Sequence, residues 1–153
     1  MIRHLLLLLA ASCALASAHA GDFNFEAYKP VSLTSVAERQ KYQASDYLIE
    51  AGNTKYTVVG IYTGRHREID AKTKELIHRW VKSLRHPKEY ESLFDNEVEI
   101  ESDGKKFWLP IQNPMVQSFA SEFREGSAVK LYIMLIGGTK DRMVFAINEF
   151  QNQ

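Results

Sequence analysis

The segment 97–111 constrains the local geometry of this chain more tightly than any other stretch. Its sequence, EVEIESDGKKFWLPI, places Asp103-Gly104 between two runs of residues that alternate in polarity. An Asp-Gly pair supplies the positive φ angles that a two-residue turn between antiparallel strands requires. The turn sets the register of the hairpin, so Ile100 is expected opposite Phe107. The apolar side chains of the two strands then share one face.

The other face of this hairpin combines acidic side chains with an aromatic one. Glu97, Glu99 and Glu101 lie on its first strand, and Lys106 and Trp108 on its second. We interpret this face as solvated, with Glu101 and Lys106 forming a cross-strand charge pair. An outward Trp108 beside carboxylates would be able to stack on a sugar ring or hold a cationic peptide side chain. The alternative is that Trp108 is covered by another part of the chain.

Residues 1–20 have the pattern of a secretory signal peptide. A positive start at Arg3 is followed by an apolar run from Leu5 to Ala16, and Ala18-His19-Ala20 has the small residues of an A-x-A cleavage site. The apolar run is roughly 12 residues, whereas a membrane span needs about 20. The sequence therefore predicts export to the periplasm or the medium. A lipoprotein anchored through Cys13 is the minor alternative.

Without those twenty residues the chain has 133 residues and no cysteine. An exported chain of this kind has no disulfides, so burial of apolar side chains must stabilise it, and a domain of this size buries roughly two-thirds of its unfolded surface. Thiol catalysis and thiolate metal sites are excluded. The remaining eighteen Lys and Arg against nineteen Asp and Glu argue against nucleic acid as a partner.

The rest of the chain predicts an α+β, mostly antiparallel fold. Residues 21–50 form an N-terminal arm with a short helix from Ser35 to about Gln43 and a strand at 46–50, and 51–153 form one domain. The expected elements of that domain are strands at 56–65, 97–102 and 105–111, a helix over 71–85 with Asp70 as its N-cap, a second helix that Asn113-Pro114 opens and Gly126 ends, and strands at 129–136 and 143–150.

This order of elements favours a small OB-like barrel with two helices. The last five elements match the tail of a five-stranded OB plan, in which a helix separates the third and fourth strands. Gly60 in the middle of the first strand would permit a bulge or a sharp coil there. An SH3-like barrel and an open antiparallel sheet packed on helices are the alternatives.

His66 is the strongest candidate for catalysis in the sequence. Glu68 and Asp70 are close to it, so an imidazole with an orienting carboxylate could act as a general base in a small exported hydrolase. Arg65 and Arg67 flank His66, however, and their charge disfavours a bound cation. The sequence contains no recognised spacing of metal ligands and no nucleophile motif, so no metal and no cofactor are predicted.

We therefore favour a non-enzymatic exported binding module of unknown ligand. Its predicted ligand face comprises Trp108, Glu99, Tyr132 and Met134. Its partner would be another exported protein, a peptide or a saccharide, with no nucleic acid and no membrane span. A further hypothesis is an inhibitor or accessory subunit that acts through loops at 137–141 or 86–95, because binding residues are concentrated on loops.

Overall fold

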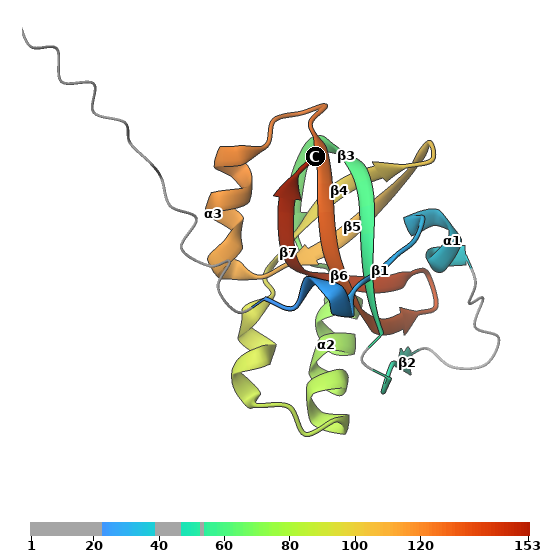
Figure 1. Cartoon of the computed structure of the whole chain (residues 1–153). Helices are drawn as coiled ribbons and strands as arrows, with labels where there is room; N and C mark the ends of the chain where they lie inside the picture. Colours follow the sequence, from blue (N-terminus) through green and yellow to red (C-terminus); the bar gives the residue numbers. More distant parts are fainter. Residues whose placement is uncertain (1–22, 39–46, 53) are drawn as a thin grey trace, which may run out of the picture.

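The structure is a computed structural model, and it describes residues 23–38, 47–52 and 54–153. The predicted signal peptide, with Cys13, lies outside these residues. The described part is an α+β fold with one seven-stranded sheet, and most of its strand pairs are antiparallel (Figure 1). Its elements, in chain order, are η1 (Phe25–Ala27), β1 (Lys29–Pro30), α1 (Leu33–Glu38), β2 (Tyr47–Ile49), β3 (Lys55–Glu68), α2 (Ala71–Ser83), η2 (Lys88–Leu93), β4 (Asn96–Ser102), β5 (Lys105–Ile111), α3 (Asn113–Glu122), β6 (Ala128–Thr139) and β7 (Met143–Asn152).

The strand order is β1-β3-β4-β5-β7-β6-β2, and β3 also pairs with β6. Each of these two long strands therefore has neighbours on both sides. β5 and β7 run parallel where Ile111 meets Ile147. The pairs β3–β4, β3–β6, β4–β5 and β6–β7 are antiparallel. In Figure 1 the strands curl around one another, and α2 with η2 projects from one end of them.

The predicted hairpin register is confirmed. Ile100 lies opposite Phe107, and Glu99 lies opposite Trp108. The turn residues Asp103 and Gly104 have φ angles of 52° and 73°, as such a turn requires. The predicted cap of α2 is also confirmed, because the Asp70 carboxylate accepts a hydrogen bond of 2.8 Å from the backbone N–H of Thr73.

Two apolar clusters hold the fold together. The larger lies among β3 to β7 and takes in α1 and α3, with Leu33, Phe119 and Ile133 almost fully buried. The second fixes α2 and η2 against one face of β6 and β7, and its members include Trp80 and Phe94. This second cluster carries the helical segment that forms one wall of the candidate site.

Several local predictions were wrong in detail. The first helix begins at Leu33, and Ser32 rather than Ser35 supplies the oxygen that accepts the first free N–H group. The predicted continuation to Gln43 lies outside the described residues. Helix α3, which Asn113-Pro114 was predicted to open, has Gln112 at its N-cap position. The side-chain amide of Asn113 instead donates to Ser92 and Asp95. This helix ends at Glu122, before Gly126.

The strand at 47–49 pairs with β6 and not with the strand that follows it in the chain. Tyr47 to Ile49 lie opposite Thr139 to Gly137. The glycines of β6 make this approach possible, since a Cβ atom on Gly137 would stand 2.0 Å from the carbonyl oxygen of Leu48. The local turn signal at Gly52 therefore did not decide the pairing.

Gly60 has a different role from the predicted bulge. β3 keeps its register with β6 through Gly60, and the irregularity with β4 falls between Tyr62 and His66. A Cβ atom on Gly60 would lie 2.4 Å from Cγ2 of Ile100 and 2.9 Å from the carbonyl oxygen of Glu101. The glycine is needed because β4 packs directly against its α-carbon.

Replacing Gly60 with alanine is expected to lower the free energy of unfolding by about 1–3 kcal/mol, because the added methyl overpacks a buried contact. Chemical denaturation of G60A and of the neighbouring control V59A measures this. Val59 is 43% exposed, so its truncation should change the free energy of unfolding much less. Equal stability of G60A and the unmodified protein would refute the close approach.

Candidate functional site

The predicted acidic face of the hairpin is buried at two of its three carboxylates, so its interpretation as a wholly solvated face was wrong. Glu97 is 0% exposed and Glu99 is 2% exposed, whereas Glu101 is half-buried and lies opposite the exposed Lys106, as predicted.

The two fully buried carboxylates meet arginine side chains from β3: Arg67 lies 2.6 Å from Glu97, and Arg65 lies 2.9 Å from Glu99. A carboxylate can be buried in its ionised form when a cation is paired with it in this way. The alternating glutamates of β4 are therefore explained by ion pairs with the arginines of β3.

Trp108 lies half-buried beside these pairs. The guanidinium groups of Arg67 and Arg65 stand 4.0 and 5.3 Å from the centre of its ring. Glu99 is its direct cross-strand partner, as the register predicted. Two of the four predicted ligand-face residues are thus together, but protein cations occupy the positions that the hypothesis gave to a ligand.

Arg142, in the turn between β6 and β7, joins this group to helix α2. Its guanidinium donates to the Glu97 carboxylate at 2.7 Å, to Asp70 at 3.0 Å and to the Thr73 hydroxyl at 2.7 Å. Its other nitrogen donates to the carbonyl oxygen of Trp108 at 2.8 Å. One side chain therefore binds β4, β5 and the first turn of α2.

The carboxyl of Asp70 is electrostatically tuned by these contacts. Partial burial acts to raise its pKa, but the hydrogen bonds from Thr73 and the charge of Arg142 outweigh burial and hold the pKa below its ordinary value. Asp70 thus stays ionised as the cap of α2. It is not available to orient a histidine.

His66 is exposed on β3 and lines neither of the two clefts described below. Within the described ranges its imidazole forms no hydrogen bond or ion pair, and the carboxylates of Asp70, Glu97 and Glu99 are bound to other groups. Glu68, the other predicted partner, is exposed on the same strand and forms no side-chain hydrogen bond or ion pair with His66. In the described part of the chain, His, Cys, Asp and Glu side chains also do not gather into a group that could hold a metal ion.

The other two predicted ligand-face residues lie elsewhere. Tyr132 is 3% exposed and packs edge-on against the rings of Phe23, Phe25 and Tyr28 from the N-terminal segment. Met134, two residues further along β6, lines a large cleft. The four residues therefore do not form one surface.

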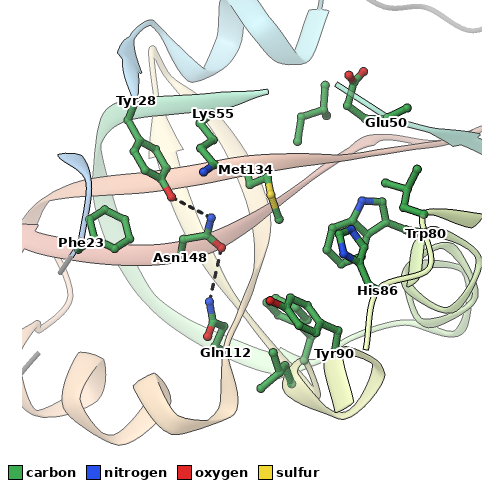
Figure 2. Close-up of a pocket in the computed structure, with 15 residues that line it drawn as sticks. Phe23, Tyr28, Glu50, Lys55, Trp80, His86, Tyr90, Gln112, Met134 and Asn148 are labelled. Atoms are coloured by element: carbon green, nitrogen blue, oxygen red, sulfur yellow. Dashed lines mark hydrogen bonds between the residues drawn. The ribbon is translucent and has the colours of Figure 1, made fainter. Parts of the chain in front are cut away.

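This cleft is large enough to hold a ligand. It has a volume of about 730 Å³ and lies between α2–η2 on one side and β6, β7 and the N-terminal segment on the other (Figure 2). Its lining residues are Phe23, Tyr28, Glu50, Ala51, Lys55, Trp80, Leu84, His86, Tyr90, Leu93, Phe94, Gln112, Met134, Leu135 and Asn148. A cavity of this size matches sites for small molecules, which occupy roughly 300–1,000 Å³.

One wall of the cleft is a compact cluster of three rings. The imidazole of His86 packs against both Trp80 and Tyr90, with ring centres 4.3 Å and 5.4 Å away, and the centres of Trp80 and Tyr90 are 6.2 Å apart. Trp80 is buried in the second apolar cluster, whereas Tyr90 is 38% exposed. The aromatic cluster therefore extends from the core to the surface and borders the cleft.

The opposite wall carries the polar side chains. The Gln112 amide donates to Asn148 at 3.5 Å, and the Asn148 amide donates to the Tyr28 hydroxyl at 3.0 Å. The Lys55 ammonium lies 5.6 Å from the centre of the Tyr28 ring. Figure 2 shows these polar side chains facing the aromatic cluster across the cleft.

A second, smaller cleft of about 380 Å³ lies between α2 and η2. Nδ1 of His78 lies 3.1 Å from a carboxylate oxygen of Glu91 on its lining. This contact ties the two helical segments together, so we assign it a structural role.

The sequence patterns did not identify the larger cleft, which Trp80 and Tyr90 line. Trp80 falls within the helix predicted over 71–85, and Tyr90 falls within the segment 86–95, which the sequence predicts as a loop for a partner protein. The available signal was a concentration of aromatic residues outside the predicted strands, at 23–28 and 86–94. Only the fold brings those two segments to one cavity.

No known protein-family model matches the chain, and it has no match among curated proteins. Within residues 23–38, 47–52 and 54–153, no helix has both the length and the apolar character needed to cross a membrane.

Replacing Asp70 with asparagine is expected to destabilise the protein by about 1 kcal/mol at pH 7, because asparagine retains the cap but loses the charge that faces Arg142. The pKa of Asp70 is lower in the folded chain than in the unfolded one. Its charge therefore stabilises the fold above about pH 4, and this contribution is lost as the pH falls through the folded pKa.

Urea unfolding of the unmodified protein and D70N between pH 2 and pH 7 measures this difference. The control D141N removes a carboxylate from the exposed pair with Lys72 and should change the stability less. A gap between D70N and the unmodified protein that is constant across the pH range would contradict the assignment.

Proposed function

We propose that this protein is an exported, non-enzymatic binding module whose ligand lies in the cleft between α2–η2 and the sheet. The observation that carries the proposal is the cleft itself, in which the rings of Trp80, His86 and Tyr90 face the polar chain of Gln112 and Asn148. Binding sites typically combine an apolar, aromatic lining with a few polar groups that orient the ligand. A ligand with an aromatic ring, such as a peptide side chain, fits this arrangement.

An OB-like barrel is the architecture we propose for this module. Its support is the cycle of strand pairs, in which β3 pairs with β4, β4 with β5, β5 with β7, β7 with β6, and β6 with β3. Helix α3 lies between β5 and β6, the third and fourth of these five strands in chain order. This position and the parallel pairing of β5 with β7 agree with the OB plan. In this proposal α2 and η2 are an insertion between the first and second strands of the barrel.

Export is supported by the sequence pattern of residues 1–20, with its A-x-A site at Ala18 to Ala20. The place of action in this proposal is the periplasm or the medium. The near balance of acidic and basic side chains gives no support for nucleic acid as the ligand.

The Trp108 face remains a prediction for a second binding surface. Trp108 is half-buried, and the arginines that cover it have exposed side chains, at 63% for Arg65 and 45% for Arg67. We rank it below the cleft, because Glu99 beneath it is fully engaged with Arg65 and Thr63.

Replacing Tyr90 with alanine is expected to weaken binding of the neutral fluorescent probe N-phenyl-1-naphthylamine about tenfold, because the exposed ring of the aromatic cluster is removed. Tyr90 is exposed, so Y90A should remain folded. Titration of the probe, with its fluorescence as the readout, measures the affinity.

The matched control is W108F, which changes the rival aromatic site and keeps a ring beneath the two arginines. It should bind the probe as the unmodified protein does. Loss of binding in W108F with full binding in Y90A would overturn the cleft proposal and favour the Trp108 face.

A further inference from the structure

Two side-chain acceptors of the cleft are engaged by the protein. Oε1 of Glu50 accepts from the backbone N–H of Gly52 at 2.8 Å and from the Thr54 hydroxyl at 3.4 Å. The side-chain oxygen of Asn148 accepts from Gln112.

The donors, in contrast, are available. The Tyr28 hydroxyl accepts a hydrogen bond from Asn148, so its own hydrogen remains to be donated. Burial, aided by the charge of Glu149, raises the pKa of Tyr28 above its ordinary value despite the hydrogen bond from Asn148. The hydroxyl thus keeps its proton at neutral pH.

Lys55 adds a positive charge near the Tyr28 ring. Its side chain is half-buried, and its ammonium lies against the Tyr28 ring. Among the residues that the structure describes, no carboxylate forms an ion pair with it. Figure 2 shows the ammonium on the same side of the cleft as the Asn148 amide. Two donors, one of them charged, therefore converge where a ligand anion could lie.

The remainder of the cleft is apolar. The helical wall, which carries the aromatic cluster, also includes Leu84, Leu93 and Phe94. The sheet wall includes Met134 and Leu135. A saccharide carries hydroxyl groups all around its ring and would leave many of them without partners here. A flat apolar ring would instead pack against the aromatic cluster in an offset or edge-to-face arrangement.

We propose that the cleft binds aromatic carboxylates, with the ring against Tyr90 and His86 and the carboxylate held by Lys55 and the Tyr28 hydroxyl. This inference rests on the proposed function, since it names the ligand class of the same cleft. The shared chemistry could come from a free aromatic acid or from the C-terminal aromatic residue of a peptide.

The test compares two pairs of probes that differ only in charge. 2-Naphthoate is matched with 2-naphthamide, and the peptide Gly-Gly-Phe is matched with its C-terminal amide. The chain has two tryptophans, Trp80 in the cleft and Trp108 outside it. Their indole N–H resonances in ¹H–¹⁵N spectra, assigned with W108F, report separately on the two places.

The carboxylate probes should shift the Trp80 resonance and leave the Trp108 resonance in place. K55M should weaken their binding about tenfold, because a charged hydrogen bond is lost, while binding of the amide probes should not change. K55R should retain most of the affinity. The matched control is K130M, since Lys130 lies 5.4 Å from the Tyr132 ring in a similar geometry but does not line the cleft.

Binding of 2-naphthoate alone would identify a free acid as the ligand type, and binding of Gly-Gly-Phe alone would identify a peptide C-terminus; either result supports the inference. Equal binding of acid and amide probes at Trp80, with no effect of K55M, would overturn the aromatic-carboxylate inference and leave the binding-module proposal intact. No shift of the Trp80 resonance with any probe would overturn both.

Discussion

The buried carboxylate of Glu97 is the interaction on which the arrangement of helix and sheet depends. It is inaccessible to solvent and bound by two guanidinium groups, from Arg67 on β3 and Arg142 beyond β6. Removing one partner of such a buried pair typically costs about 3–5 kcal/mol, because a charge is left without compensation. Arg142 must therefore stay in place, and its remaining donors bind the first turn of α2.

The position of the cleft follows from this anchor. Arg142 holds the N-terminal end of α2, and the second apolar cluster packs the rest of the helix against β6 and β7. Trp80, near the other end of α2, is thereby fixed as the buried member of the aromatic cluster, and η2 brings Tyr90 to within 6.2 Å of it. The opposite wall comes from the sheet and the N-terminal segment, which Tyr132 holds through its contacts with Phe23 and Tyr28. The proposed ligand site thus lies between two separately anchored layers.

The elements that the sequence predicted well are those determined by neighbouring residues. Asp103-Gly104 set the hairpin register, and Asp70 started α2, because turns and caps are decided within a few positions. The burial of Glu97 was not visible, since Arg67 lies 30 positions away and Arg142 lies 45 positions away. The cleft was missed for the same reason: its walls come from chain segments that only tertiary packing brings together.

Crystallographic screening of a fragment library, in which neutral rings and ring carboxylates are equally represented, tests the central claim that this cleft is the ligand site. The account predicts that ring carboxylates collect in the cleft, with the ring beside Tyr90 and the carboxylate within hydrogen-bonding distance of Lys55. Fragments that collect over Trp108 or on other surfaces, with the cleft empty in every data set, would contradict it.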